Sequence, residues 1–361
     1  MKLKTISVEN FRNVENQKLE FSPETTLIYG NNAEGKTNII EAVYMFAHSK
    51  SFRRSREKDL IRFGEEEARL TAVFSEKQKD VCFEIKISRK DGKSFYYNGI
   101  KLEKMRDFFG HFLAVLFVPE YLKIIKSGPS ERRSFLDAAL CQIKPGYVSS
   151  LFVYHRLCEE KNALLKKYSG SENDKILFEV YNERLAKTAA DISSQRLDFL
   201  NKISVSAKVH FKNMSGRDTL ELQFMPSGLS VIPESFEEYY KDIFKKSQDA
   251  DLKALRMTTG AQMDDVEIII NSNSARSFAS QGQQRSAVVA LKLAEGEVVG
   301  QITKRSPIYL FDDILSELDE IRREYILKAL HNKQVIITSC TKDSEKDVYT
   351  YFANNGIYTR L

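Results

Sequence analysis

The sequence has no tryptophan, only seven prolines and only four cysteines among its 361 residues. The cysteines are far apart and form no Cys-x-x-Cys pair, so they predict neither a zinc site nor a disulfide framework. These four residues are Cys82, Cys141, Cys158 and Cys340. We therefore expect buried thiols in a reducing compartment.

The chain also lacks a long apolar segment and a strong excess of one charge. No apolar run approaches the ~20 residues that a membrane-spanning helix requires, so we expect a cytoplasmic protein with no membrane partner. The net charge of +5 is too mild to predict nucleic-acid binding by itself. Any affinity for DNA would have to come from basic residues clustered on one face.

The stretch around residues 26–47 organises the rest of the chain. An apolar run is followed by Gly-x-x-x-x-Gly-Lys-Thr and then by a helical pattern. This order predicts a nucleotide-phosphate loop, because glycines let backbone N–H groups turn inward and a helix start attracts anions. Lys36 would reach the β- and γ-phosphates, and Thr37 would bind Mg²⁺. The predicted nucleotide-binding residues here are Gly30, Asn31, Asn32, Ala33, Glu34, Gly35, Lys36 and Thr37.

Composition divides the chain into three parts. Residues 1–125 hold the phosphate loop and several strand-like runs, and Asn98-Gly99 predicts a hairpin turn between two of them. Residues 126–255 form a helical insert, and residues 256–361 return to alternating strands and helices. We predict an α/β fold, a P-loop ATPase head with a mixed sheet and an antiparallel flank, which carries an inserted α-helical arm.

The clearest helix of the insert is expected over residues 174–203, or ~45 Å at 1.5 Å per residue. Its apolar residues fall at the three-and-four spacing of an amphipathic helix, which favours a core between antiparallel helices over a partner surface. They are Leu177, Tyr181, Leu185, Thr188, Ile192 and Phe199. Two basic clusters could contact DNA phosphates or could be solvated surface. These are residues 50–58 and the set Lys123, Lys126, Arg132 and Arg133.

A second anion-binding motif lies near residue 280. Ser280 and Gly282 precede a helix-forming run over residues 287–298. A serine and free N–H groups at the positive end of a helix suit a phosphate. Taken alone, however, an ordinary N-cap role for Ser280 is favoured.

The next segment changes that balance. Residues 308–312 form an apolar strand that ends in the paired aspartates Asp312 and Asp313, which is the Walker B pattern. Asp312 would bind Mg²⁺ opposite Thr37, and Asp313 would act as general base toward the attacking water. The predicted catalytic residues are thus Lys36, Asp313 and Ser280, with Thr37 and Asp312 as metal ligands.

This order of motifs resembles the ABC-type ATPases of the SMC-like group. The strings at 10–13, 278–286 and 316–319, which read NFRN, FASQGQQRS and SELD, are similar to those of the RecF family of bacterial recombination mediators. The resemblance implies a slow ATPase in which two chains sandwich two ATP molecules. It adds Arg12, Ser280, Gly282 and Gln283 to the nucleotide-binding residues, Ser280 facing the nucleotide of the other chain.

The resemblance also implies a function and partners. It predicts a DNA clamp that works with RecO and RecR at gapped DNA, helps the recombinase RecA replace single-strand-binding protein, and supports replication and the SOS response. Two alternatives stay open at this point. One is an SMC-like ATPase subunit of a defence or nuclease complex, and the other is a small-molecule kinase, which would leave the motifs at 280–285 and 316–319 unexplained.

Three departures from the family pattern have consequences. Ala33 stands where a second loop glycine is usual, which should be tolerated if the backbone there keeps a negative φ. Residues 260–265, which read GAQMDD, replace a stretch richer in proline, histidine and arginine. No histidine follows the strand at 335–338, where Thr338, Ser339 and Cys340 stand. The last departure predicts slow turnover.

Overall fold

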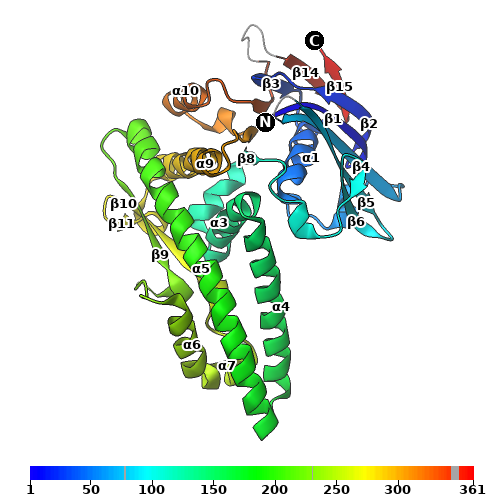
Figure 1. The fold of residues 1–361 in the computed structure, drawn as a ribbon. Coiled ribbons are helices and arrows are strands. Elements are labelled where there is room, and N and C mark those ends of the chain that lie inside the picture. Colours follow the sequence, from blue (N-terminus) through cyan, green and yellow to red (C-terminus); the bar gives the residue numbers. More distant parts are fainter. Residues whose placement is uncertain (77–78, 230, 343–348) are drawn as a thin grey trace. The chain divides into compact units, whose positions relative to one another are not determined.

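The computed structural model describes residues 1–76, 79–229, 231–342 and 349–361. The chain forms two compact units. Unit 1 combines Met1–Leu122 with Val288–Leu361, and unit 2 is Lys123–Ala287. Figure 1 labels most of the elements of both. In the part of the chain that is described, no helix combines the length and apolar character needed to cross a bilayer.

A mixed sheet forms one layer of unit 1. Its strand order is β15-β14-β3-β13-β12-β8, with all neighbours parallel except the pair β14 and β15. The bounds are β3 Thr25–Tyr29, β8 Ala114–Phe117, β12 Ile308–Asp312, β13 Val335–Ser339, β14 Tyr349–Asn354 and β15 Ile357–Arg360. Strands β8 and β12 are buried along their whole length, as expected for a parallel sheet covered on both faces.

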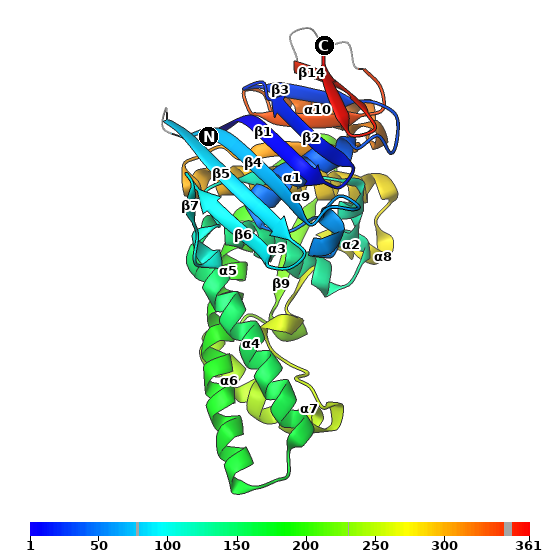
Figure 2. The same ribbon diagram turned by 90° about the vertical axis from the view of Figure 1, so that its right-hand side faces the viewer.

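An antiparallel sheet forms the predicted flank (Figure 2). Its order is β2-β1-β4-β5-β6-β7, and the turn residues Asn98 and Gly99 both have positive φ, which confirms that hairpin. The bounds are β1 Lys2–Phe11, β2 Val14–Glu20, β4 Glu67–Glu76, β5 Lys79–Ser88, β6 Gly92–Tyr97 and β7 Ile100–Lys101. Alternate side chains of β4 and β5 are buried, so one face of this sheet packs on the core.

Helix α1, Lys36–His48, contacts both sheets and is buried almost throughout. Its apolar side chains join those of both sheets in one core, and each such burial contributes roughly 1.5–3 kcal/mol. The same unit holds α10 Glu320–Ala329 and most of α9 Gln281–Thr303, with short 3-10 turns η1 Glu57–Leu60, η2 Met105–Asp107, η3 Pro119–Leu122 and η6 Leu315–Glu317. The core therefore fixes the helix that follows the phosphate loop.

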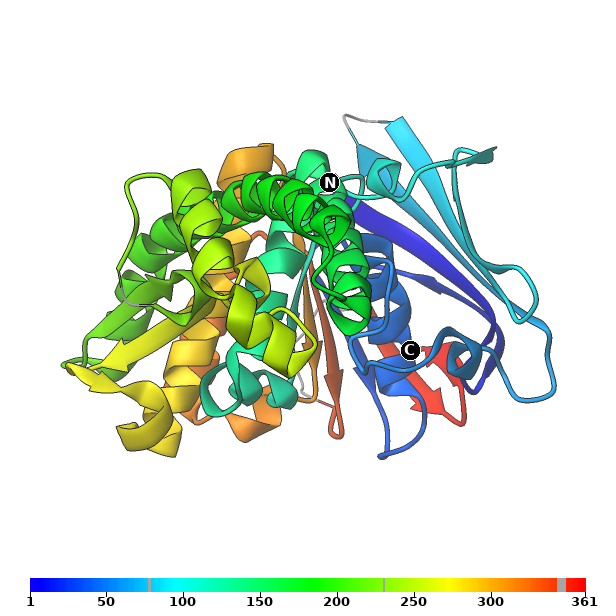
Figure 3. The same cartoon turned by 90° about the horizontal axis from the view of Figure 1, so that it is seen from below.

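Unit 2 is the expected helical arm. Its helices are α2 Lys123–Lys126, α3 Pro129–Ile143, α4 Pro145–Lys167, α5 Glu172–Ser215, α6 Phe236–Lys246, α7 Gln248–Ala254 and α8 Ala275–Phe278, with 3-10 turns η4 Pro226–Gly228 and η5 Ala261–Met263. A three-stranded antiparallel sheet completes it, formed by β9 Leu220–Met225, β10 Asp265–Ile270 and β11 Asn273–Ser274. Helices α4 and α6 both pack along α5 (Figure 3).

The arm differs from the sequence expectation in three respects. Helix α5 has 44 residues rather than the 30 of the predicted range 174–203, because apolar spacing continues to Met214, two residues before its cap at Gly216. Leu177 is exposed, and the fully buried neighbour Phe178 takes its place in the core. Residues 256–287, expected in the C-terminal ATPase lobe, belong to unit 2, because β10 pairs with β9.

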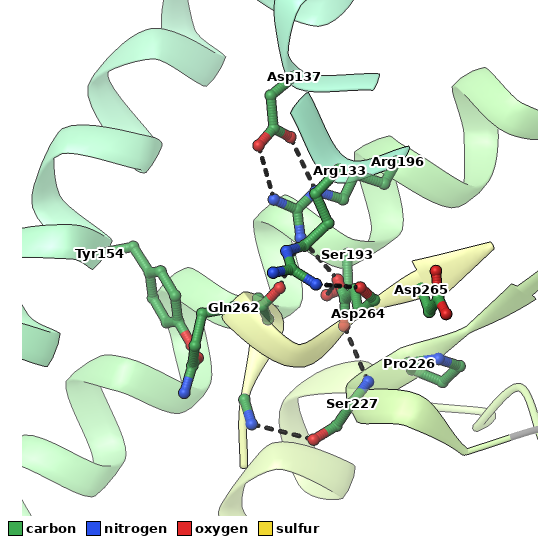
Figure 4. Close-up of polar contacts among 12 residues, drawn as sticks. Arg133, Asp137, Tyr154, Ser193, Arg196, Pro226, Ser227, Gln262, Asp264 and Asp265 are labelled. Carbon is green, nitrogen blue, oxygen red and sulfur yellow. Dashed lines mark hydrogen bonds and ion pairs between the residues drawn. The ribbon is translucent and has the colours of Figure 1, made fainter. Parts of the chain in front are cut away.

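A buried polar network joins the helices of the arm to residues 260–265 (Figure 4). Arg196 of α5 forms a bidentate pair with Asp137 of α3 and also bonds to Asp264 Oδ2 at 2.9 Å. Asp264 is fully buried and accepts three further bonds, from the Ser193 hydroxyl, the Tyr240 hydroxyl and the Ser227 N–H. The unusual stretch at 260–265 thus stabilises the arm.

This network corrects the interpretation of the second basic cluster. Arg132 is buried and forms a bidentate ion pair with Asp265, with distances of 2.6 and 2.9 Å. Arg133 is half-buried and donates to the Asp264 carbonyl at 2.8 Å. Because both guanidinium groups have partners inside unit 2, neither is a free contact for DNA phosphates.

The Asp264→Ala substitution is expected to lower the free energy of unfolding by about 3–5 kcal/mol, because it removes one carboxylate partner of the buried Arg196. Urea denaturation followed by circular dichroism measures it. The matched control is Asp191→Ala on α5, the helix that carries Arg196, where the exposed Asp191 carboxylate accepts from Ser150 at 2.6 Å. A loss below about 0.5 kcal/mol is expected there, and equal losses in the two variants would contradict the account.

His48 at the end of α1 is a second buried polar group. Its ring stacks on Tyr44 with centroids 4.1 Å apart, and burial, reinforced by the positive charges of Lys292 and Lys50, lowers its pKa to about 3. An unfolded histidine titrates near 6.5. Below that pH the unfolded chain binds a proton that the folded chain does not, so acid favours unfolding.

We expect this histidine to reduce the free energy of unfolding by roughly 2 kcal/mol between pH 7 and pH 5. Urea denaturation at several pH values should show a shallower dependence for His48→Gln than for the unmodified chain. The control is His331→Gln, at an exposed position after α10. If the pH dependence of His48→Gln matched that of the unmodified chain, the buried neutral histidine would not be its source.

Candidate functional site

The phosphate loop connects β3 to α1, as the sequence predicts. Both of its glycines, Gly30 and Gly35, lie so close to neighbouring atoms that a side chain would collide with them. A Cβ on Gly35, which has φ +100°, would lie 2.8 Å from Asn13 Oδ1, and one on Gly30 would lie 2.4 Å from the Ala353 carbonyl oxygen. Neither position accommodates a larger residue without a shift of its surroundings.

The backbone at Ala33 does not meet the condition of a negative φ. Its φ is +68°, in the left-handed region that glycine occupies without cost. An alanine in this region costs about 1 kcal/mol, because its Cβ approaches a backbone oxygen. The loop therefore keeps the conformation that a second glycine would give, at some cost in backbone strain.

Lys36 is almost fully buried inside the loop. Its ammonium group donates to the Gly30 carbonyl at 2.7 Å and to the Asn31 carbonyl at 3.0 Å. Asp313 Oδ2 lies 4.0 Å from the same nitrogen. The loop thus holds one positive charge where the sequence predicts the phosphates of a nucleotide.

Thr37 and Asp312 meet as predicted. The Thr37 hydroxyl donates to Asp312 Oδ1 at 2.8 Å. Burial raises the pKa of the Asp312 carboxyl above its usual value, and the hydrogen bonds from Thr37 and Thr338 offset only part of this rise. A hydroxyl and a carboxylate at the edge of a phosphate loop are the oxygen ligands that Mg²⁺ takes in such sites, so this pair fits the ion.

The next aspartate has an unusual backbone. Asp313 has φ +50°, and its carbonyl accepts from the Ser316 hydroxyl at 2.8 Å. Its N–H donates to the Thr338 hydroxyl at 3.0 Å. Asp319, at the end of the same motif, caps α10 by accepting from the Arg322 N–H at 3.0 Å. The segment from Asp313 to Asp319 is therefore held at both ends.

A cavity of about 660 Å³ lies over the loop within unit 1. Its basic lining residues are Arg12, Lys36, Arg53, Lys58 and Arg89. The sequence interpretation missed Arg53, Lys58 and Arg89 as cavity residues, and also Ile61 and Phe63, whose side chain is 99% exposed. The basic run at 50–58 was the available signal, but only a contact with DNA phosphates or a solvated surface loop was considered for it.

Glu41 of α1 organises two of these arginines. Arg12 forms a bidentate pair with this fully buried carboxylate at 2.6 and 2.9 Å, and Arg53 lies 3.5 Å from it. Arg53 also donates to Asn38 Oδ1 at 3.0 Å. Arg12 was predicted to bind nucleotide, and the structure places it at the cavity together with the phosphate loop.

The C-terminal hairpin β14–β15 packs on the loop, which the sequence did not predict. The Tyr358 hydroxyl donates to the Gly35 carbonyl at 2.8 Å. The Gly356 N–H donates to the Glu34 carbonyl at 2.9 Å, and the Asn355 N–H donates to the Glu34 carboxylate. Residues more than 300 positions away in sequence therefore fix the shape of the loop.

Cys340 corrects the expectation of four buried thiols. It is exposed, and the other three cysteines are partly buried. Its Sγ lies 3.0 Å from Asn32 Oδ1 and 3.7 Å from Lys36 Nζ, so it belongs to the phosphate-loop surroundings. Among the residues that the structure describes, no three His, Cys, Asp or Glu side chains gather into a metal site.

The serine motif lies in unit 2, at the start of α9. Ser280 Oγ accepts from the Gln283 N–H at 3.2 Å, and Gln283 Oε1 accepts from the Ser280 N–H at 2.9 Å. This reciprocal arrangement is a capping box. Gln283 also donates to Asp218 Oδ2 at 3.0 Å, just after α5. The cap role expected for Ser280 alone is thus present, and Gly282 lies in the first turn of the same helix.

Comparisons with known proteins agree with the family resemblance seen in the sequence motifs. The RecF/RecN/SMC N-terminal domain model matches residues 2–357. A DNA replication and repair protein RecF of Clostridium acetobutylicum is 36% identical over 352 residues, which cover 97% of this chain and 95% of that protein. A RecF of Clostridium botulinum is 35% identical over 369 residues, with both chains fully covered.

Solved structures agree with these relatives. The structure described as the recombination mediator protein RecF-ATP in the RecFOR pathway matches with a TM-score of 0.93 and 36% identity, covering 100% of this chain and 97% of that one. An Smc head bound to the C-winged helix domain of ScpA matches with a TM-score of 0.56 and 16% identity, covering 100% and 97%. The second likeness concerns the fold alone.

The Tyr358→Phe substitution is expected to raise the Kd for ATP about three- to tenfold, because it removes the hydrogen bond that fixes Gly35. Isothermal titration calorimetry measures this. The control is Tyr351→Phe, which loses bonds to the Glu20 backbone from the same hairpin but does not contact the loop. Equal affinities for Tyr358→Phe and the control would show that the hairpin does not shape the site.

Proposed function

The chain belongs to the RecF family of DNA replication and repair proteins, and from this premise we propose that it is an ATP-dependent DNA-binding protein of recombinational repair. In this proposal, two chains bind two ATP molecules between them and close on DNA. The closed dimer helps load recombinase at gaps. Slow ATP hydrolysis then opens it, so the enzyme acts as a switch.

One observation carries the proposal. The Walker A and Walker B residues meet at one end of the parallel sheet, where Thr37 Oγ1 and Asp312 Oδ1 are 2.8 Å apart and Lys36 Nζ and Asp313 Oδ2 are 4.0 Å apart. A buried ammonium group, a hydroxyl and two carboxylates around a phosphate loop are the groups that phosphoryl transfer requires. The cavity above them supports binding of a nucleoside triphosphate.

Each residue has a chemical role in this site. Lys36 would neutralise charge on the β- and γ-phosphates from within the loop, and Arg12 would add charge at the cavity wall. Thr37 and Asp312 would hold Mg²⁺, which when bound polarises the γ-phosphate. Asp313 would accept the proton of the water that attacks the γ-phosphate. Hydrolysis with Mg²⁺ is part of the proposal.

Ser280 supplies the second half of the site in this proposal. Its Oγ accepts from Gln283, which holds the hydroxyl at the positive end of the 23-residue helix α9. We infer that this helix start faces the γ-phosphate of the ATP bound by the other chain, with Gly282 and Gln283 beside it. The start of α1 already binds the nucleotide phosphates within one chain. A second helix start, supplied by the other chain across the interface, would add further stabilisation of the γ-phosphate.

The proposed partners are DNA, RecO and RecR, with the recombinase acted on indirectly. Support comes from the solved relative, which is named as a recombination mediator in the RecFOR pathway. We propose sequence-independent contacts to DNA phosphates, a cytoplasmic location, and a contribution to replication and the SOS response. The defence or nuclease alternative is not favoured, because relatives that match nearly the whole chain are named replication and repair proteins.

The Lys36→Ala substitution should raise the Kd for ATP roughly 100-fold or more, because it removes the buried charge from the loop. Calorimetric titration of ATP·Mg²⁺ tests this. The control is Lys328→Ala, an exposed position on α10, for which ATP affinity should stay within twofold of the unmodified chain. Unchanged affinity in Lys36→Ala would remove the basis of the proposed nucleotide site.

Ser280→Arg should leave ATP affinity unchanged but block dimer formation, because a long cation would occupy the proposed interface. Molecular mass in solution with ATP·Mg²⁺ tests this in an Asp313→Asn background, which suppresses hydrolysis. The control is Val205→Arg, which adds the same charge at a 71% exposed position on α5. If Ser280→Arg still dimerised with ATP, the cross-interface role of the serine would be wrong.

A further inference from the structure

Thr338 lies between the two nucleotide motifs. It belongs to β13, which pairs with β3 on one side and with β12 on the other. In the parallel register Thr338 is opposite Asp312 on β12 and opposite Ile28 on β3, two residues before the phosphate loop begins. Its side chain is almost completely buried.

The Thr338 hydroxyl contacts both aspartates of the Walker B pair. It donates to Asp312 Oδ1 at 2.9 Å, and it accepts from the Asp313 N–H at 3.0 Å. The Phe311 carbonyl, at 3.4 Å, is a more distant acceptor for the same proton. The Thr338 hydroxyl thus donates a hydrogen bond to the Asp312 carboxylate and accepts one, through a lone pair, from the Asp313 backbone N–H.

Both contacts concern groups whose positions matter for the reaction. Asp312 Oδ1 also accepts from Thr37, so two hydroxyl groups set the orientation of that carboxylate. Asp313 has φ +50°, which for a residue other than glycine is held by its surroundings. The bond from its N–H to Thr338 is one such restraint, and it fixes where the Asp313 side chain leaves the backbone.

We propose that Thr338 is a positioning residue for ATP hydrolysis, one that sets the metal-binding carboxylate of Asp312 and the general base Asp313 together. This inference rests on the proposed function. If Thr37 turns its hydroxyl toward Mg²⁺, Thr338 remains to orient Asp312. Because the same hydroxyl holds the Asp313 N–H, one side chain contacts both the metal-binding carboxylate and the backbone of the base.

A purely structural role makes different demands on this position. A threonine that only fills space would be replaced without loss by valine, which has nearly the same shape and β-branching. If Thr338 instead acts through its hydroxyl, serine should replace it with little loss of activity, because serine keeps the hydroxyl and lacks only the methyl group. The valine and serine variants therefore separate the two roles.

The experiment measures steady-state ATP hydrolysis by the full chain, with ATP and Mg²⁺ varied independently. For Thr338→Val we expect kcat to fall roughly tenfold or more, and the Mg²⁺ concentration at half-maximal rate to rise severalfold. KM for ATP should stay within about twofold, because the phosphate loop keeps its contacts. Thr338→Ser should remain within about threefold of the unmodified chain in all three quantities.

Three results would overturn the inference: an unchanged kcat in Thr338→Val, equal losses in the valine and serine variants, or a loss confined to KM. If Thr338→Val does not fold, Thr338→Ala is compared with Thr338→Ser in the same way. Asp313→Asn is measured alongside. If the unmodified chain hydrolyses ATP and Asp313→Asn does not, failure of the Thr338 prediction concerns Thr338 alone. If neither hydrolyses ATP, the proposed function itself fails.

Discussion

The hydrogen bond between Thr37 and Asp312 joins two residues that are 275 positions apart and brings the Walker A and Walker B motifs together. It depends on the order of three parallel strands, since β13 lies between the strand that leads into the phosphate loop and the strand that ends in Asp312. The shared core of α1 and both sheets fixes that order. The site is therefore a consequence of sheet register as much as of its motifs.

Much of this arrangement could be predicted from the sequence. Gly30 to Thr37 and the paired aspartates are short motifs with a local mechanism, and apolar runs bounded by turn residues located their strands. The hairpin at Asn98 was confirmed for the same reason. Local rules suffice where the structure is decided within a few residues.

What the sequence did not reveal depends on long-range contacts. Tyr358 and Thr338 reach the site only through strand pairing, which a periodic pattern does not specify. Ala33 has a positive φ, although its residue type opposes it. Arg132 was assigned to a surface cluster, but the partner that buries it, Asp265, lies 133 positions away. The Gly216 cap of α5 was likewise outside the predicted helix.

The central claim is that each complete ATP site combines Lys36 of one chain with Ser280 of another. The most direct test mixes Lys36→Ala with Ser280→Ala, a serine variant that adds no bulk at the interface, and each variant should be inactive alone. In a mixed dimer, one of the two sites combines the intact Lys36 of the chain substituted at Ser280 with the intact Ser280 of the chain substituted at Lys36. ATP hydrolysis should therefore return on mixing. A mixture as inactive as its components would contradict the account.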